Sequence, residues 1–267
     1  MNDNKIKIDE SELALCRSAF YEALSLGFRS PTNETRERLI DDNQNQALAE
    51  IAAILDENGG VEKPRILTQL VRKLKECLDV EKLEALEHSY QFYFGHTAQA
   101  KVPPYETGYG EETLFQQPQQ LGDISGFYNA FGLQLNSKEH ERADHISCEC
   151  EFLSFLTRKE AYALNHNDIT MLAETRKAQK LFLKDHLGRF APSFSKLLIR
   201  KDPVGFYGVF GKLCNEFISM ECDRHGVTAG SEQLRLRSSV IPDECIACGS
   251  GEEIIREIND SNYNPEQ

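Results

Sequence analysis

Residues 144–164 read DHISCECEFLSFLTRKEAYAL, a run in which apolar residues recur at intervals of three and four. This spacing places Phe152 and Leu156 on one side of a helix, which predicts an amphipathic helix packed against a core. At about 100° per residue, His145 and Glu149 fall in the same sector. The predicted helix therefore carries two ionisable groups, one turn apart, on its apolar face.

The rest of the chain repeats this helical periodicity, and runs of alternating β-branched residues are nearly absent. We therefore predict an all-α protein without a sheet of any size. Gly27 to Pro31 is a stop signal for the first helix, and Asp202 with Pro203 can start the last one. The predicted helices cover 11–27, 46–56, 62–78, 80–94, 123–131, 139–164, 168–186 and 203–224, with one irregular stretch at 95–110.

Three parts are expected along the 267 residues. Residues 1–9 should form a flexible N-terminus, and residues 10–225 a single large multi-helix domain, for which the length is sufficient. From Gly226 the composition shifts to small and polar residues with a Cys-x-x-Cys sequence. We predict that residues 226–267 are a C-terminal appendage to the helical domain.

The composition excludes several classes of protein. The formal net charge is −13, whereas nucleic-acid binders usually present a basic surface that neutralises phosphates, so we expect no nucleic-acid partner. The N-terminus lacks the apolar segment of a secretory signal, and no stretch approaches the roughly 18 apolar residues of a membrane span. We expect a cytoplasmic protein with no stable membrane insertion, whose eight cysteines stay reduced.

The irregular stretch contains the loop Pro103-Pro104-Tyr105-Glu106-Thr107-Gly108-Tyr109. A buried charge is costly unless it is paired, so Asp144, His145 and Glu149 should find polar partners, and this loop is the obvious source. Two arrangements remain open. One is a closed hydrogen-bond network that fixes the loop to the core, which is the commoner case. The other is the polar floor of a pocket that accepts part of a partner chain.

Three motifs follow one another in order: Tyr90 with Phe94 and Gly95, Pro103–Glu106 with Tyr109, and Asp144–Ile146 with Glu149. This series resembles the signature of the TorD/DmsD/NarJ chaperones, and the resemblance covers about residues 10–224. It implies a TorD-like helical domain. Cys148 and Cys150 depart from the apolar residues usual in this helix, and core packing is the expected role for both.

The resemblance implies a cytoplasmic chaperone and not an enzyme. Such proteins bind the apo catalytic subunit of a molybdopterin-dependent oxidoreductase, or its twin-arginine leader, and assist insertion of the molybdenum cofactor before export or assembly. They occur as monomers or homodimers. An acidic groove walled by aromatic residues would suit a leader with two arginines beside an apolar stretch. If the binding residues of the family are transferred to the matching positions of this sequence, the client-binding residues are Tyr105, Glu106, Tyr109, Asp144, His145 and Glu149.

The C-terminal part suggests a metal site. Cys245 and Cys248 form a Cys-x-x-Cys turn that presents two thiolates to one ion, and upstream Cys222 and His225 share a helix face. Together these four residues could hold Zn²⁺ in a tetrahedral site or ligate an iron–sulfur cluster. In the alternative, Cys222 packs in the core and the other two cysteines are an unligated surface dithiol.

Two other functions compete with the chaperone. The first is a metal- or redox-responsive regulatory protein that acts through the cysteine-containing tail. The second is a helical enzyme with His145 and Glu149 as a general acid–base pair. The second is the weaker, because the sequence offers no nucleophile, metal or oxyanion site to accompany the pair. We therefore expect no catalytic residues.

Overall fold

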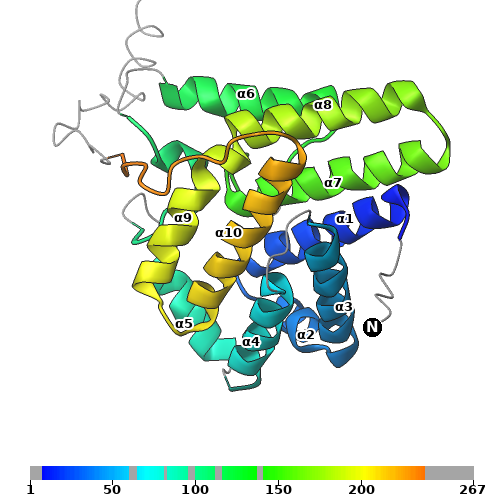
Figure 1. The fold of residues 1–267 in the computed structure, drawn as a ribbon. Helices are drawn as coiled ribbons and strands as arrows, with labels where there is room; N and C mark the ends of the chain where they lie inside the picture. Colours follow the sequence, from blue (N-terminus) through cyan, green and yellow to red (C-terminus); the bar gives the residue numbers. More distant parts are fainter. Residues whose placement is uncertain are drawn as a thin grey trace, which may run out of the picture. The chain divides into compact units, whose positions relative to one another are not determined.

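The computed structural model describes residues 8–59, 65–80, 83–95, 100–111, 116–136 and 141–237. These residues form ten α-helices and one short 3₁₀ helix, and their only β pairing is two isolated bridges, so the predicted all-α class is confirmed (Figure 1). The elements are α1 (Glu10–Gly27), α2 (Asn33–Ile40), α3 (Asp42–Asn58), α4 (Ile66–Val80), α5 (Leu83–Tyr93), η1 (Glu106–Gly108), α6 (Gln116–Ala130), α7 (Ile146–Asn165), α8 (Ile169–Asp185), α9 (Leu187–Lys201) and α10 (Phe206–Arg224).

Helix α7 is the central element of the fold. It packs along α1 on one side and against α8 on another, while α10 packs on α9 and α4. Between α1 and α7, the hydroxyl of Ser18 donates to the carbonyl of Ser154 at 2.9 Å, and the hydroxyl of Ser154 donates back to the carbonyl of Ser18 at 2.9 Å. The two small side chains let the helices approach closely and satisfy each other's polar groups.

The aromatic core is centred on Phe28, directly after α1. Its ring packs edge-on against Phe94, Phe194 and Phe210, with centroids 6.4, 5.2 and 4.7 Å away. A Cβ atom at Gly27 would overlap the Phe210 ring, so the glycine that ends α1 makes room for α10. These edge-to-face contacts add to the stability that burial of the rings provides.

The start of α7 differs from the prediction. The helix expected from residue 139 begins at Ile146, because His145 is its N-cap. The backbone of His145 is extended, and its Nδ1 accepts a hydrogen bond from the Ser147 amide at 3.2 Å. The prediction that His145 lies on the helix face is therefore wrong, since its side chain closes the helix end instead.

The start of α10 also differs: its N-cap is Gly205, and the predicted Asp202 acts on the helix end from three residues earlier. The helix begins at Phe206, three residues after Pro203. The carboxylate of Asp202 reaches forward and accepts hydrogen bonds from the amides of Gly205 and Gly208, both at 3.0 Å. A carboxylate there satisfies a free amide of the first turn and stabilises the positive end of the helix dipole.

Helix α9 was not expected, and a proline inside it explains how the following segment packs. Pro192 has no amide hydrogen, so the carbonyl of Gly188, four residues earlier, lacks a partner within the helix. The amide of Gly230 donates to this carbonyl at 2.9 Å. Residues 226–237, which we predicted to belong to the C-terminal appendage, thus pack on the helical body. We call this segment the C-terminal strap.

The remaining differences concern short or polar helices. Helix α2 has the sequence NETRERLI, without an apolar period, and its start is marked by the Thr32 hydroxyl, which accepts from the Thr35 amide at 3.1 Å. Helix α6 starts at Gln116, earlier than predicted, since its first turns are rich in glutamine. Nowhere in the described ranges does a helix combine the length and hydrophobicity needed to cross a membrane.

Candidate functional site

The second and third sequence motifs lie side by side. The amide of Glu106 donates to the carbonyl of Asp144, and the amide of Ile146 donates to the carbonyl of Pro104, both at 2.9 Å. These two bonds make a short antiparallel bridge between the loop and the start of α7. The expectation that the loop supplies the partners of the α7 motif is confirmed. The first motif, with Tyr90 and Phe94, is buried in the aromatic core.

Asp144 is fully buried and held from two directions. Its Oδ2 accepts hydrogen bonds from the amide and hydroxyl of Thr107, at 3.1 and 2.7 Å. Arg142 donates to both carboxylate oxygens, from Nε and Nη2, at 3.0 Å each. This forked ion pair, with the hydroxyl beside it, offsets the cost of burying the charge.

Glu106 is also fully buried, and its partners come from the α8–α9 junction. His186 Nδ1 lies 3.0 Å from one carboxylate oxygen, and Arg189 Nη2 forms an ion pair with the other. Burial alone would raise the pKa of Glu106, but the hydrogen bonds and charges of His186 and Arg189 together hold the pKa below its ordinary value. Glu106 is therefore ionised at neutral pH.

Glu149, in the first turn of α7, is the third buried carboxyl of this group. Burial raises the pKa of Glu149 well above its ordinary value, and the nearby charges of Glu106 and Asp144 raise this pKa further. Glu149 is therefore protonated at neutral pH, and neither of its buried carboxyl oxygens has a hydrogen-bond partner among the described residues. Three carboxyls, Glu106, Asp144 and Glu149, with Thr107, Arg142, His186 and Arg189, make up what we call the acid cluster.

His145 is 1% exposed and neutral. Burial lowers the pKa of His145 to about 3, and the charges of Arg29 and Arg142 act in the same direction. Because Nδ1 accepts from the Ser147 amide, the ring hydrogen is on Nε2. His145 and Glu149 are both enclosed by protein, so the proposed general acid–base pair has no surface that a substrate could reach.

The two tyrosines of the loop have different surroundings. Tyr105 is half-buried, with its ring edge-on to His145 at 5.3 Å and under the guanidinium of Arg142 at 4.6 Å. Tyr109 is 1% exposed, and its hydroxyl donates to the carbonyl of Pro103 at 2.8 Å. Tyr105 therefore has a side that a partner could touch, whereas Tyr109 braces the loop internally.

The six predicted client-binding residues thus come together, but five of them are buried. Glu106 and Asp144 lie in a buried network of hydrogen bonds and ion pairs, as the first of the two arrangements predicts, whereas the buried carboxyl of Glu149 has no hydrogen-bond partner among the described residues. Sequence analysis missed the bases of the cluster, Arg142, His186 and Arg189. His186 and Arg189 lie about 40 residues from Glu149 in sequence, and the one usable signal was that three buried acids require compensating bases.

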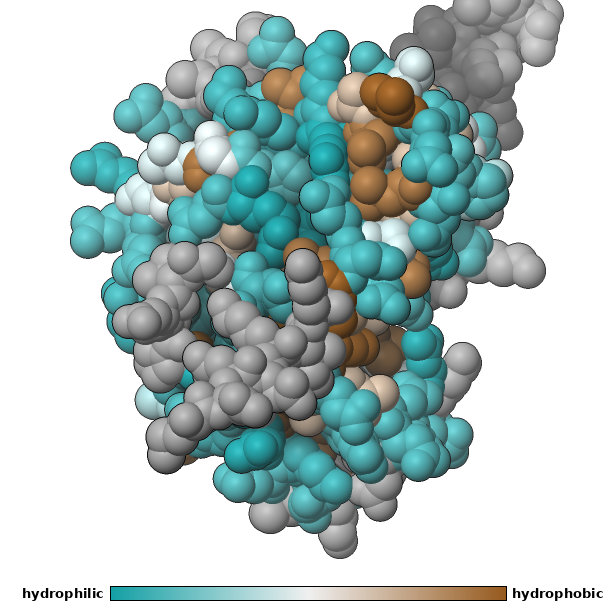
Figure 2. Space-filling view, turned by 45° about the vertical axis from the view of Figure 1, so that its right-hand side comes forward, coloured by the Kyte–Doolittle hydropathy of each residue, from teal (hydrophilic) through white to brown (hydrophobic). Residues whose placement is uncertain are grey.

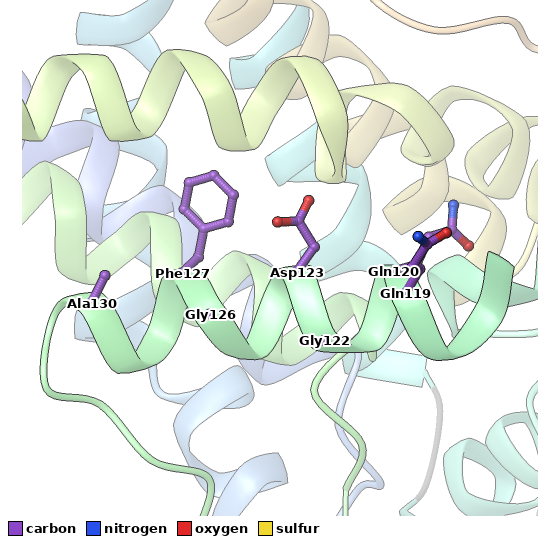
Figure 3. Close-up of a pocket in the computed structure, with 7 residues that line it drawn as sticks. All are labelled: Gln119, Gln120, Gly122, Asp123, Gly126, Phe127 and Ala130. Atoms are coloured by element: carbon purple, nitrogen blue, oxygen red, sulfur yellow. The ribbon is translucent and has the colours of Figure 1, made fainter. Parts of the chain in front are cut away.

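An open groove of about 820 Å³ runs along α6 beside the acid cluster. Figure 3 shows Gln119 and Gln120 at one end of the groove, Ala130 at the other, and Asp123 and Phe127 between them. A Cβ atom at Gly122 or Gly126 would meet no atom within 4 Å, so there is free space above the helix. Asp123 Oδ2 lies 3.3 Å from His186 Nε2, which connects the groove to Glu106.

The rest of the surface offers scattered apolar side chains. Figure 2 shows hydrophobic residues in separate patches on a mostly hydrophilic face. The most exposed large apolar side chains are Ile169 and Val204, at 80% and 77%, and they lie at the starts of α8 and α10. Single exposed apolar residues are normal on protein surfaces and do not by themselves indicate a binding site.

A second buried polar cluster lies between α1, α7, α8 and α10. The guanidinium of Arg17 forms three bonds with the Glu221 carboxylate, two from Nε at 2.9 Å and one from Nη2 at 2.8 Å, and one with Glu160 at 2.8 Å. Its Nη2 also donates to Gln179 at 2.7 Å and lies 3.0 Å from His225 Nε2. Arg176 and Arg224 add a second positive charge to Glu160 and Glu221, respectively. We call this group the Arg17 cluster.

The predicted metal site is described only in part. Cys245 and Cys248 lie outside the described residues. Cys222 is fully buried, and burial raises the pKa of its thiol to about 12. His225 Nε2 faces Arg17, which can only donate, so this nitrogen accepts a hydrogen bond and is not free for a cation. The Cys222 thiol and His225 Nε2 are thus enclosed in the described structure, and metal binding by Cys222, His225, Cys245 and Cys248 stays a prediction.

The C-terminal strap crosses α9 and reaches the loop of the acid cluster. The Ser193 hydroxyl donates to the carbonyl of Ser231 at 2.6 Å, and the amide of Leu234 donates to the Ser193 oxygen at 2.7 Å. A Cβ atom at Gly230 would overlap the carbonyl oxygen of Arg189, so glycine is needed for this close approach. The base of the strap is thereby fixed to α9.

Comparisons with known proteins agree with the motifs. The chain is 26% identical to the perchlorate reductase assembly chaperone protein of Dechloromonas aromatica (strain RCB), over 82% of this chain and 93% of that protein. It is 30% identical to the selenate reductase assembly chaperone protein of Thauera selenatis, over 41% of this chain and 54% of that protein.

Among solved structures, a proposed redox enzyme maturation protein from Archaeoglobus fulgidus aligns with a TM-score of 0.41 and 18% identity, over 82% of this chain and 99% of that one. The family described as nitrate reductase delta subunit matches residues 62–196, which is just over half of the chain. This match confirms the resemblance to the TorD/DmsD/NarJ proteins. The chain belongs to the nitrate reductase delta subunit family.

Proposed function

We propose that this protein is a cytoplasmic assembly chaperone for a molybdopterin-dependent oxidoreductase. It binds the apo catalytic subunit, or its twin-arginine leader, and assists insertion of the molybdenum cofactor before export or assembly. Family membership supports this proposal, as does the likeness to an assembly chaperone over 93% of that protein's length. The formal net charge of −13 favours a client segment that carries arginines.

The burial of the acid cluster is the observation that best supports a binding role over a catalytic one. Glu106, Asp144 and Glu149 are each 0% exposed, and the carboxylates of Glu106 and Asp144 are paired with the bases around them. Such a network fixes the loop of residues 103–109 in one shape. A rigid loop beside an open groove suits recognition of a partner chain, whereas catalysis needs reacting groups within reach of a substrate.

A regulatory role through the cysteine tail receives less support. The two relatives described above are both named as assembly chaperones. Cys222 and His225 take part in packing and in the Arg17 cluster, and neither side chain is available as a switch. We therefore propose no regulatory function for the tail.

The test is affinity purification of the tagged full-length protein from its native host under anaerobic growth, followed by mass spectrometry. We expect recovery of one molybdopterin oxidoreductase catalytic subunit. Tyr105→Ala should reduce the recovered amount severalfold, because Tyr105 is the motif residue with an exposed side. Tyr162→Ala is the matched control, since Tyr162 is 54% exposed near the end of α7 and should leave recovery unchanged.

Absence of any such subunit, in cells where it is demonstrably expressed, would contradict the proposal. Equal loss of the subunit with the Tyr105 and Tyr162 variants would contradict the assignment of the loop as the binding region. Circular dichroism of both variants should match the wild type, which separates lost binding from lost fold.

A further inference from the structure

The tip of the C-terminal strap lies against the loop in the manner of an added strand. Its sequence is Arg235-Leu236-Arg237. The amide of Gly110 donates to the carbonyl of Arg235, and the amide of Arg237 donates to the carbonyl of Gly108, both at 2.9 Å. These bonds form the second isolated antiparallel bridge of the structure. The outer edge of the loop can therefore hold an extended chain by its backbone.

The same edge contains a binding site for one guanidinium group. Arg237 donates from Nε to the carbonyl of Glu111 at 3.0 Å and from Nη1 to the carbonyl of Thr107 at 3.0 Å. Nη1 also donates to the side-chain oxygen of Gln120 at 3.1 Å. We call these three acceptors the arginine socket. Acceptors placed around a planar group suit arginine better than lysine, whose ammonium is a compact point charge.

The arginine socket is fixed from the inside by the acid cluster. Thr107, which supplies one acceptor, is held through its amide and hydroxyl by Asp144. Its neighbour Glu106 is held by His186 and Arg189. The buried carboxylates of Glu106 and Asp144 thus keep the outer edge in shape from beneath, while the Thr107 carbonyl faces what binds there. A preformed site loses little conformational entropy on binding.

The arginine socket opens onto the groove along α6. Gln120 belongs to both, because it accepts from Arg237 and lines one end of the groove (Figure 3). Farther along, Phe127 and Ala130 give the groove an apolar lining, and Gly122 and Gly126 leave space above the helix. A chain with an arginine in the socket could therefore place neighbouring apolar residues in the groove.

The strap tip buries less apolar side-chain surface than its base, where Val227 is 7% exposed and Ala229 and Leu234 pack against the core. The base is joined to α9 through Gly230 and Ser193. The tip is joined to the loop by two backbone bonds and the Arg237 side chain, while Leu236 remains 43% exposed. Segments that bury little apolar surface open at low free-energy cost. The tip can therefore leave the loop while the base stays in place.

We propose that the loop edge at 108–111, the arginine socket and the α6 groove form the binding site for an extended client segment with an arginine beside apolar residues. Residues 235–237 occupy this site in the free protein and are displaced by the client segment. This inference rests on the proposed function for the source of the segment. Because the strap tip occupies the site, any other chain must displace it in order to bind. This competition reduces the binding of chains that fit the site poorly.

The first experiment measures binding of a synthetic peptide, Gln-Leu-Arg-Leu-Arg-Ser, which copies residues 233–238. In the full-length Arg237→Ala variant the socket is vacated, and we expect the peptide to bind about tenfold more tightly than to the wild type. Arg235→Ala is the matched control, because it removes the same charge from the same segment without emptying the socket. Its affinity should stay within about twofold of the wild type, since a small local effect of charge remains.

A second variant and a second peptide check the recognised group. Adding Gln120→Leu to Arg237→Ala should remove most of the gain in affinity, because one of the three acceptors is lost. A peptide with both arginines replaced by lysine should bind more weakly to Arg237→Ala than the original peptide. Equal affinity of the two peptides, or an equal gain in the Arg235 and Arg237 variants, would overturn the proposal.

Amide hydrogen exchange followed by NMR tests the displacement itself. With the wild-type protein at saturating peptide, the Arg237 amide should lose protection, because its bond to the Gly108 carbonyl is broken. The Gly110 amide should remain protected, because a carbonyl of the peptide replaces that of Arg235. Unchanged exchange at both amides would overturn the proposal.

The failure of this inference is distinguishable from the failure of the proposed function. Co-purification of the oxidoreductase subunit with the wild type, together with no peptide binding by Arg237→Ala, would overturn the arginine site and leave the chaperone standing. Recovery of no such subunit with the wild type or the variant would contradict the chaperone itself.

Discussion

The two buried polar clusters of this protein differ in their balance of charge. In the Arg17 cluster, Glu160 and Glu221 face Arg17 directly, and Arg176 and Arg224 add further positive charge. In the acid cluster, three carboxyls share two arginines and one histidine. The first cluster keeps its acids ionised. The second keeps one of its acids, Glu149, protonated.

This difference matches the position of each cluster in the fold. The Arg17 cluster joins α1, α7, α8 and α10, which form the rigid frame of the domain. The acid cluster lies beneath the loop edge that holds the strap tip. A network in which every acid is paired with arginine resists change, whereas a buried acid without a paired base responds to its surroundings. We infer that the first cluster clamps the frame and the second shapes the binding edge.

The largest loss of stability is expected from a substitution that breaks the Arg17 cluster. Arg17→Leu leaves Glu160 and Glu221 buried without their main partner, which should lower the free energy of unfolding by about 3–5 kcal/mol. Urea unfolding at pH 7 measures this loss. A loss below about 1 kcal/mol would show that the cluster is not a clamp.

A smaller effect, with a defined pH dependence, is expected for Glu160→Gln. Burial alone would raise the pKa of Glu160, but Arg17 and the hydrogen bonds around it lower this pKa to about 2. The ionised group therefore contributes stability above pH 4.5, and that contribution is lost as the pH falls toward 2. The variant should be about 2–3 kcal/mol less stable than the wild type at pH 7, and the deficit should shrink in acid.

The opposite pH dependence is expected for Glu149→Gln. Because the pKa of Glu149 is raised, the folded protein holds a proton that the unfolded chain releases above its ordinary pKa. The wild type should lose about 1.4 kcal/mol per pH unit relative to the variant as the pH rises from 5 to 7. Glutamine has nearly the same shape as the neutral carboxyl but does not ionise.

Unfolding curves of the wild type and the two variants, at several pH values, test these signs together. A Glu149 variant that loses stability relative to the wild type with rising pH would show that Glu149 is ionised. In that case the distinction between the two clusters would be wrong.

The periodic part of the sequence predicted most of the fold. The helices around the core, such as α1 and α7, follow from apolar spacing, because burial of one face decides their position. Helix α9 was missed because Pro192 interrupts the pattern, and its loss of a hydrogen bond is compensated by Gly230 from a distant segment. The sequence around Pro192 does not indicate that a distant amide will replace the lost hydrogen bond.

The sequence predicted which residues form the candidate site but not the direction in which their side chains point. The motifs indicated that Glu106, Asp144 and His145 come together, and they do. Sequence could not show that these side chains point inward, because burial depends on where Arg189 and the strap lie. The surface left for a partner is the outer edge of the same loop.

The most direct test of the chaperone and its binding edge is hydrogen exchange of the full-length protein with and without the purified apo catalytic subunit that it co-purifies with. We expect added protection at residues 108–111 and along α6, and no change around Arg17 in α1 or Glu221 in α10. Protection confined to other surfaces, or no protection at saturating subunit, would contradict the binding edge proposed here.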